Sequence, residues 1–198
     1  MKSFSRRIHR FATFTNVVSG GNEREALWAS GQGNVTDSRE CARWVSGQGL
    51  AQNGLAFRIK ADSGGWDSVV LERNIYAYRF WVFLAIYFHS GSDHTTNFDV
   101  GPAVDLGNYL GRATARDVFP LRVCAQLSGD TLRFAIAKGV DLMPPVGTVG
   151  RGGTLSLSPK QFPNTGLTGT YVAHIPLGTS TVVDHVAISG IGSGPLNK

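Results

Sequence analysis

The chain of 198 residues is 42% hydrophobic and only 17% charged, and it contains 25 glycines. This composition supports a sizeable core with many turns and disfavours long solvated helices. The formal net charge is +5, and the first ten residues contain no acid but four basic residues, Lys2, Arg6, Arg7 and Arg10. The rest of the chain is therefore nearly neutral, which argues against a nucleic-acid-binding face.

The amino-terminal residues do not predict a secretion signal, because residues 11–18 alternate apolar residues with Thr and Asn and form no continuous apolar segment. No stretch reaches the roughly 18 apolar residues of a membrane span. We therefore expect synthesis in the cytosol and no membrane insertion. Residues 1–10 are predicted to form a basic arm that either docks on an acidic neighbour or on nucleic acid, or stays solvated.

Short alternating segments separated by glycine predict strands in the first half of the chain. Residues 19–37 are glycine-rich and polar, and we interpret them as a loop with a helical turn at residues 24–28. The predicted strands cover residues 8–17, 42–45, 55–61 and 67–73.

Tyr76–Phe88 is apolar on both sides if it is extended. A buried helix is the alternative, but the aromatic and β-branched content favours a strand. Such a strand is covered on both faces or lines a groove with one of them. Flat aromatic rings complement the C–H faces of sugars, and core packing is the competing role for them. The candidate carbohydrate-binding residues are Trp66, Tyr78, Trp81 and Tyr87.

Residues 90–108 form a long polar segment that we interpret as a loop. Oxygen ligands of the kind that Ca²⁺ prefers occur here at Asp93, Asn97 and Asp99. Their spacing matches no fixed metal motif, and Asp and Asn are also common turn residues. These are weak metal candidates, and the sequence predicts neither a bound metal nor another cofactor.

Leu121–Ala137 predicts a β-hairpin, because apolar residues alternate on both sides of a three-residue connection with Gly129 in its middle. A connecting segment interrupted by proline and glycine residues follows over residues 138–151. Further strands are expected over residues 154–157, 167–175 and 179–189. Eight to ten short strands without a repeat predict an all-β antiparallel sandwich over residues 11–190, with a flexible tail at 191–198.

Cys41 and Cys124 are the two cysteines. They can form at most one disulfide, and reduced thiols are the expected state in the cytosol. No C-x-x-C pair is present, so zinc and redox signatures are missing.

The second half resembles the end of concanavalin A-like lectin/glucanase (laminin-G-type) jelly rolls. The resemblance covers about residues 119–189 and is carried by Gly129-x-Thr131-Leu132, by Gly169-x-Tyr171 and by Val183-Asp184-x-Val186. It implies a jelly-roll fold. Domains of this type with a glycine-rich tail are similar to minor tail proteins of actinobacterial phages, which implies a virion component.

The glycosidases of that superfamily place several carboxylates on one strand, and this chain has no such run. Glu40 and Glu72 stand alone, and no G-x-S-x-G elbow is present. Asp184 and His185 are adjacent in a predicted strand, so we expect them on opposite faces and unable to form a dyad. The sequence therefore predicts no catalytic residues.

We expect a non-enzymatic structural or adhesion component of a phage virion, a minor tail protein that acts in tail assembly or host attachment. The expected partners are other virion proteins, a second copy of the chain in a homo-oligomer and a cell-surface glycan, but no nucleic acid. The alternatives are a carbohydrate-binding module or lectin and a glucanase-type glycoside hydrolase. Partner docking is assigned to the arm residues Lys2, Arg6, Arg7 and Arg10.

Overall fold

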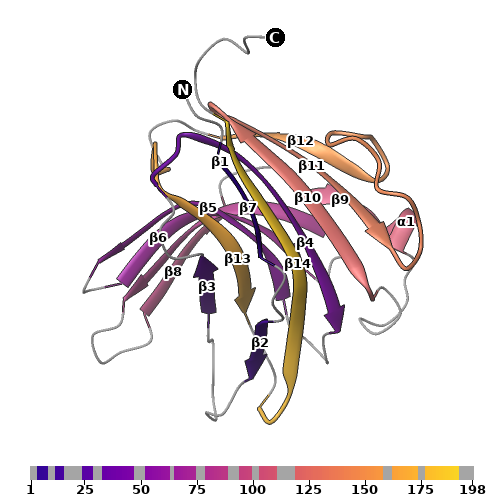
Figure 1. Cartoon of the computed structure of the whole chain (residues 1–198), viewed down its shortest axis with the longest axis horizontal. Coiled ribbons are helices and arrows are strands. Elements are labelled where there is room, and N and C mark those ends of the chain that lie inside the picture. Colours follow the sequence, from indigo (N-terminus) through magenta and orange to yellow (C-terminus); the bar gives the residue numbers. More distant parts are fainter. Residues whose placement is uncertain are drawn as a thin grey trace.

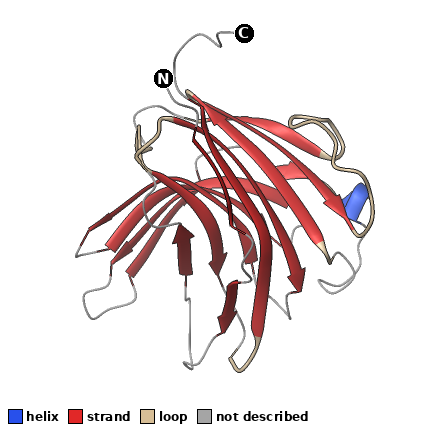
Figure 2. Cartoon of the chain, in the orientation of Figure 1, coloured by secondary structure: helices blue, strands red, loops and turns tan. Residues whose placement is uncertain are grey.

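The computed structural model describes residues 4–8, 12–15, 24–28, 33–46, 52–62, 65–74, 79–88, 94–99, 103–110, 119–157, 162–173 and 177–191. In this part of the chain strands dominate, and the regular structure includes a single short helix, α1 (Gly107–Leu110) (Figure 2). No helix among these residues is long and apolar enough to cross a membrane.

The strands form two antiparallel sheets that pack face to face (Figure 1). We call them sheet A and sheet B. Sheet A has the order β1 (Phe4–Ile8), β14 (Ser180–Ile191), β4 (Asp37–Ser46), β10 (Leu121–Ser128), β11 (Thr131–Lys138) and β12 (Gly152–Ser156), with β2 (Ala12–Thr15) also paired to β14. Sheet B has the order β3 (Arg24–Trp28), β13 (Leu167–Ala173), β5 (Gln52–Asp62), β6 (Gly65–Asn74), β7 (Arg79–Phe88) and β8 (His94–Asp99), with β9 (Val104–Asp105) paired to β7.

The main core fills the space between the sheets, because each sheet turns one apolar set of alternating side chains inward. The ring of Phe134 on β11 stacks on Phe80 of β7 at 5.2 Å between centroids. Trp44, Leu55 and Phe57 are fully buried in the same cluster. This arrangement confirms the predicted all-β antiparallel sandwich.

The predicted hairpin is present as β10 and β11, with Leu121 paired to Lys138 and Ser128 paired to Thr131. Its turn is shorter than predicted, because Ser128 already pairs across the ladder and only Gly129 and Asp130 connect the strands. Gly129 has φ +54°, a left-handed conformation that glycine adopts without steric cost.

Three predictions of local structure are wrong. Residues 24–28 form the strand β3 instead of a helical turn, since they pair with β13. Residues 94–99 form the strand β8 instead of a loop. Residues 4–8 belong to the sandwich instead of a free arm, because Phe4–Ile8 pair with β14.

Cys41 and Cys124 are directly opposite each other on β4 and β10 and form a disulfide. The expectation of reduced thiols is therefore wrong for this structure. The sequence placed the two residues 83 positions apart, and only the strand register brings their side chains together.

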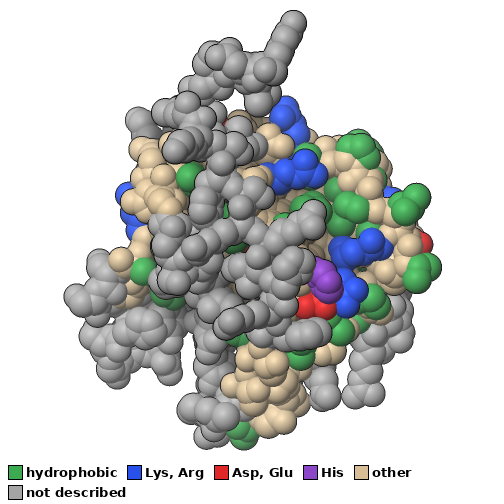
Figure 3. All heavy atoms as spheres, viewed as in Figure 1, with side chains coloured by type: hydrophobic (Ala, Val, Ile, Leu, Met, Phe, Trp, Pro, Cys, Tyr) green, Lys and Arg blue, Asp and Glu red, His purple; other side chains and the backbone are tan. Residues whose placement is uncertain are grey.

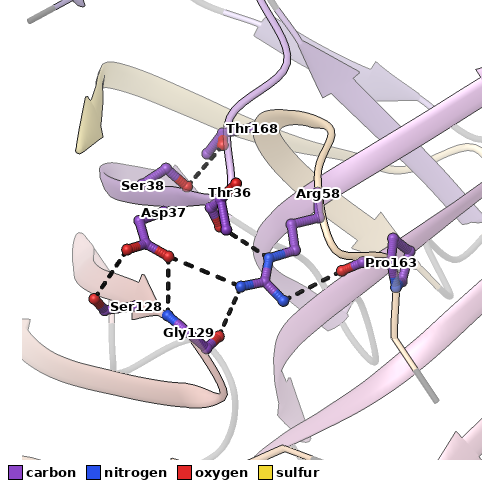
Figure 4. A network of polar contacts seen from close by, with 8 residues as sticks. All are labelled: Thr36, Asp37, Ser38, Arg58, Ser128, Gly129, Pro163 and Thr168. Carbon is purple, nitrogen blue, oxygen red and sulfur yellow. Dashed lines mark hydrogen bonds and ion pairs between the residues drawn. The ribbon is translucent and has the colours of Figure 1, made fainter. Parts of the chain in front are cut away.

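Arg58 fastens the β10–β11 turn to sheet B (Figure 4). It lies in an irregular part of β5, with φ +54°. Its guanidinium donates to the carbonyls of Thr36 at 2.9 Å, Gly129 at 2.6 Å and Pro163 at 3.2 Å. Burial lowers the pKa of this guanidinium, and the nearby carboxylates of Asp37 and Asp130 oppose that shift.

Candidate ligand-binding face

The two sheets differ in how open their outer faces are. On the outer face of sheet B the described side chains form a second buried cluster of Ala56, Ile59, Trp66, Val70, Tyr171 and Ala173. Ser68 and Glu72 belong to the same outer face, because along β6 they alternate with Val69 and Leu71 of the main core, and they are buried as well. Among the described side chains of β5, β6 and β13, this face therefore offers little surface to a ligand.

Trp66 is the one predicted aromatic whose side chain the structure describes. It is 7% exposed and packs edge-on against Tyr171, with 6.2 Å between ring centroids and an interplanar angle of 71°. A sugar platform needs an open ring face, and Trp66 has little left. The register of β6 and β7 pairs Trp66 with Tyr87 and Glu72 with Trp81, so these positions share one face of sheet B. Tyr78 lies outside the described residues.

The metal candidates also map to sheet B. Asn97 and Asp99 lie in β8, paired with Ala85 and Phe83 of β7, and Asp93 lies outside the described residues. Within the described part of the chain no three His, Cys, Asp or Glu side chains are grouped in a way that would hold a metal ion.

The outer face of sheet A is basic and partly exposed: Ala187 and Cys41 are half-exposed, whereas Ala135 and Ala137 are fully buried. Arg39 of β4 and Arg133 of β11 are exposed, Arg122 of β10 is half-buried, and the Arg43 side chain is 39% exposed. We call the surface that these four arginines share the arginine face. Figure 3 shows the Lys and Arg side chains that gather over β4, β10 and β11, with acidic and histidine side chains beside them.

The register arranges the arginine face in three rows that run across the strands. The first row is Ser189, Arg39, Gln126, Arg133 and Thr154. The middle row holds small residues, Ala187, Cys41, Cys124, Ala135 and Gly152. The third row is Asp184, Arg43, Arg122 and Ala137. Arginines thus lie on both sides of a row of short side chains, which includes the disulfide.

Asp184 anchors one end of the third row. Its carboxylate is buried and accepts two hydrogen bonds from the Arg43 guanidinium, each 2.8 Å long. The Nδ1 atom of His185 lies 3.0 Å from the same carboxylate, and the His185 side chain is 61% exposed. The prediction that Asp184 and His185 occupy opposite faces is therefore wrong. The strand is irregular between Asp184 and Ala187, and His185 has φ +50°, so strict alternation fails here.

The predicted docking residues divide between described and undescribed parts of the chain. Arg6 and Arg7 lie in β1, where the register pairs Arg7 with Ala187, the residue that begins the middle row. Lys2 and Arg10 lie outside the described residues.

Sequence reasoning missed the arginine face although a signal for it was present. Arg39 and Arg43 alternate with buried residues in β4, and Arg122 and Arg133 take outward positions in the predicted hairpin. A net charge averages over all faces of a protein, so the nearly neutral sum over the residues after the first ten hid the concentration of arginine on one face.

Comparison with known structures identifies the architecture. The exoplasmic/lumenal domain of VIP36, in a form with bound Ca²⁺ and mannose, is similar over 96% of this chain and 85% of that one, with a TM-score of 0.52 and 10% sequence identity. The chain has a lectin-like fold. No family model matches the sequence, and no curated protein matches it either.

Two further structures are similar at lower scores. The carbohydrate-binding module CBM66 of Bacillus subtilis matches 91% of both chains at 12% identity and a TM-score of 0.47. The CBM2 module of the evolved Dit of Lactobacillus casei BL23 phage J-1 matches 93% of this chain and 69% of that chain, at 14% identity and a TM-score of 0.41. The fold part of the predicted jelly-roll resemblance is confirmed, as a lectin-like sandwich, by the two-sheet topology and the similarity to VIP36.

Proposed function

We propose that this domain binds a carbohydrate through the arginine face and does not cleave it. The observation that carries the proposal is a donor-rich face with exposed arginines on a lectin-like sandwich, whereas most described side chains of β5, β6 and β13 on the outer face of sheet B are buried. Carbohydrate binding, the alternative that the sequence left open, thus becomes the main proposal.

The chemistry of the face suits a hydroxyl-rich ligand. Each guanidinium offers up to five N–H donors, and an amide both donates and accepts. Arg39, Gln126 and Arg133 supply these groups side by side in the first row. In the middle row Ala187 and Cys41 are half-exposed, whereas Cys124, Ala135 and Gly152 are buried, so a sugar ring can approach this row at its β14 and β4 end. Arg43 is held by Asp184 before any ligand arrives, which lowers the entropic cost of binding.

The same geometry supports binding without hydrolysis. Glycosidases need two carboxyl groups on either side of the scissile bond, one of them able to donate a proton. Asp184 is the carboxylate of the third row, and it is buried and paired with Arg43. Asp37, at the start of β4, accepts from the Gly129 backbone N–H at 2.9 Å and from the Ser128 hydroxyl at 3.2 Å. Both carboxylates therefore serve the structure.

A role in a phage virion stays a prediction, as does assembly with other virion proteins. The two roles are compatible, because a glycan-binding domain on a particle would serve host attachment. Co-purification of the chain with particles, followed by mass spectrometry, tests the virion role separately from glycan binding.

A glycan array probed with the purified chain tests the proposed function. We expect binding to a restricted set of glycans and no release of reducing ends from them. Ala187→Trp places a bulky ring over the half-exposed start of the middle row and should abolish binding. Leu177→Trp, in the exposed turn before β14, is the matched control and should bind normally. Equal binding by both variants, or turnover of a bound glycan, would contradict the proposal.

A further inference from the structure

We propose that the ligand of the arginine face is an acidic polysaccharide, whose chain crosses the strands along the first row so that its anionic groups contact Arg39 and Arg133 together. This inference rests on the proposed function and adds the chemical class of the ligand.

The first row carries uncompensated positive charge. Arg39 and Arg133 flank Gln126 across three adjacent strands, and the remaining positions of the row, Ser189 and Thr154, are neutral. Both arginines are exposed, and neither side chain forms an ion pair with another described residue. An exposed guanidinium that no carboxylate neutralises is available to an external anion.

The third row places two arginines directly opposite each other. Arg43 and Arg122 are cross-strand partners, and like charges in that position are unfavourable. Asp184 compensates Arg43, whereas Arg122 donates to the backbone carbonyls of Gly139 and Asp141. A carbonyl accepts a hydrogen bond but does not cancel a charge. These contacts therefore leave the charge of Arg122 uncompensated, and they hold its guanidinium at Gly139 and Asp141, on the side of the third row away from the middle row. An anionic group that approaches the third row would relieve the repulsion.

The spacing of the charges favours a polymer over a small anion. Arg39 and Arg43 are four residues apart on β4, which corresponds to about 13 Å along the strand. Arg39 and Arg133 are separated by two strand spacings, about 10 Å. A small carboxylate or phosphate reaches one of these arginines at a time. A polyanion that crosses the strands along the first row reaches both Arg39 and Arg133, and the two contacts reinforce one another.

The composition of the rows favours a polysaccharide over a nucleic acid. Single-stranded nucleic acids are bound by combining a basic surface with aromatic side chains on which the bases stack. The three rows from β14 to β12 contain Arg, Gln, Ser, Thr, Ala, Cys, Gly and Asp and no aromatic residue. Hydrogen bonds and charge are thus the available contacts, and both suit uronate or sulfate groups on a sugar chain.

The test uses two pairs of polymers that share a backbone and differ in charge: polygalacturonate with its fully methyl-esterified form, and dextran sulfate with dextran. Binding to the full chain is measured by calorimetry at low and at high salt. We expect at least one charged polymer to bind about tenfold or more tightly than its neutral partner, with the difference shrinking at high salt because exposed charges are screened. Equal affinity within both pairs would overturn the inference.

Variants localise the effect. The double variant Arg39→Gln, Arg133→Gln should lower the affinity for the charged polymer about tenfold without changing the melting temperature, because both side chains are exposed. Arg39→Lys with Arg133→Lys keeps the charge and should retain most of the binding. Lys60→Gln removes an exposed charge from sheet B and should have no effect. An equal loss with Lys60→Gln would contradict the assigned face.

Two further outcomes distinguish a failure of the proposed acidic ligand from a failure of the proposed carbohydrate binding. If neutral array glycans bind in a manner sensitive to Ala187→Trp while charge makes no difference, the proposed function stands and the acidic ligand is wrong. If single-stranded DNA of matched charge binds more tightly than either charged polysaccharide, the ligand class is wrong and the face is a nucleic-acid site.

Discussion

Asp184 and Arg43 form a two-pronged ion pair on the outer face of sheet A, with two hydrogen bonds of 2.8 Å between guanidinium and carboxylate. The pair joins β14 to β4 at the point where β14 is irregular. It also supplies the negative charge that lets Arg43 lie opposite Arg122.

Asp184→Asn should therefore destabilise the domain by about 2 kcal/mol, because the buried position loses its charge-assisted hydrogen bonds while Arg43 still faces Arg122. Urea denaturation measures the change. Combining Asp184→Asn with Arg43→Gln should cost less than the two single changes together, since the second change removes the unpaired cation. Strictly additive losses would show that the two side chains are not energetically coupled.

Glu40 is expected to weaken the fold at neutral pH. It is fully buried on β4, and its register partners Ala125 and Ile188 are core residues. Neither of its carboxylate oxygens has a hydrogen-bond partner among the residues that the structure describes. Burial raises the pKa of this carboxyl well above its ordinary value. Between the ordinary pKa and the raised pKa, the Glu40 carboxyl is protonated in the folded protein and ionised in the unfolded chain. The free energy of unfolding is therefore highest below the ordinary carboxyl pKa, and it falls as the pH rises toward the raised pKa of the folded protein.

Replacing Glu40 with Met keeps a similar volume without the polar atoms. We expect Glu40→Met to stabilise the domain by about 1–3 kcal/mol at neutral pH. The gain should be smaller at about pH 4, where the carboxyl is largely protonated in the unfolded chain as well as in the folded protein. Thermal melts at several pH values test this, and a gain that does not vary with pH would contradict a buried protonated carboxyl.

Arg58 should be essential for stability. Arg58→Met leaves the carbonyls of Thr36, Gly129 and Pro163 without their donor, with an expected loss of about 3 kcal/mol. Arg58→Lys should rescue little, because one ammonium group cannot reproduce the planar fork that reaches three separate carbonyls. Full stability of the lysine variant in urea would show that charge, and not geometry, is what this site requires.

Removing the Cys41–Cys124 disulfide should also lower stability. The bond joins residues 83 positions apart. A cross-link restricts the conformations of the unfolded chain and typically raises the free energy of unfolding by roughly 2–4 kcal/mol. The variant Cys41→Ala, Cys124→Ala should melt at a lower temperature than the oxidised wild type and at the same temperature with or without reductant. A wild-type melting temperature that does not respond to reductant would indicate that the thiols are not joined in solution.

The sequence predicted correctly those elements whose structure is determined by residues close together in the chain. The β10–β11 hairpin was predicted because alternation and Gly129 act within a few residues of each other. Residues 24–28 contain good helix formers, and they are extended only because β13, about 145 positions later, offers a strand edge. Local propensity carries no information about such a partner.

The candidate site was less predictable than the fold. Assigning Asp184 and His185 to opposite faces assumed strict alternation, which the positive φ of His185 interrupts. The arginines come from strands far apart in the chain, and only the sheet order β14-β4-β10-β11 places them side by side. The aromatic residues were more prominent in the sequence, yet Trp66 is used in packing.

The most direct test of the central claim is to map where a carbohydrate binds. Amide chemical shifts of the intact chain are followed by NMR while the tightest-binding glycan of the array is titrated in. Carbohydrate binding by the arginine face predicts the largest shift changes in β4, β10 and β11, between residues 39 and 43, 122 and 126, and 133 and 137. Changes centred on β5, β6 and β13 of sheet B, with β4, β10 and β11 unaffected, would contradict it.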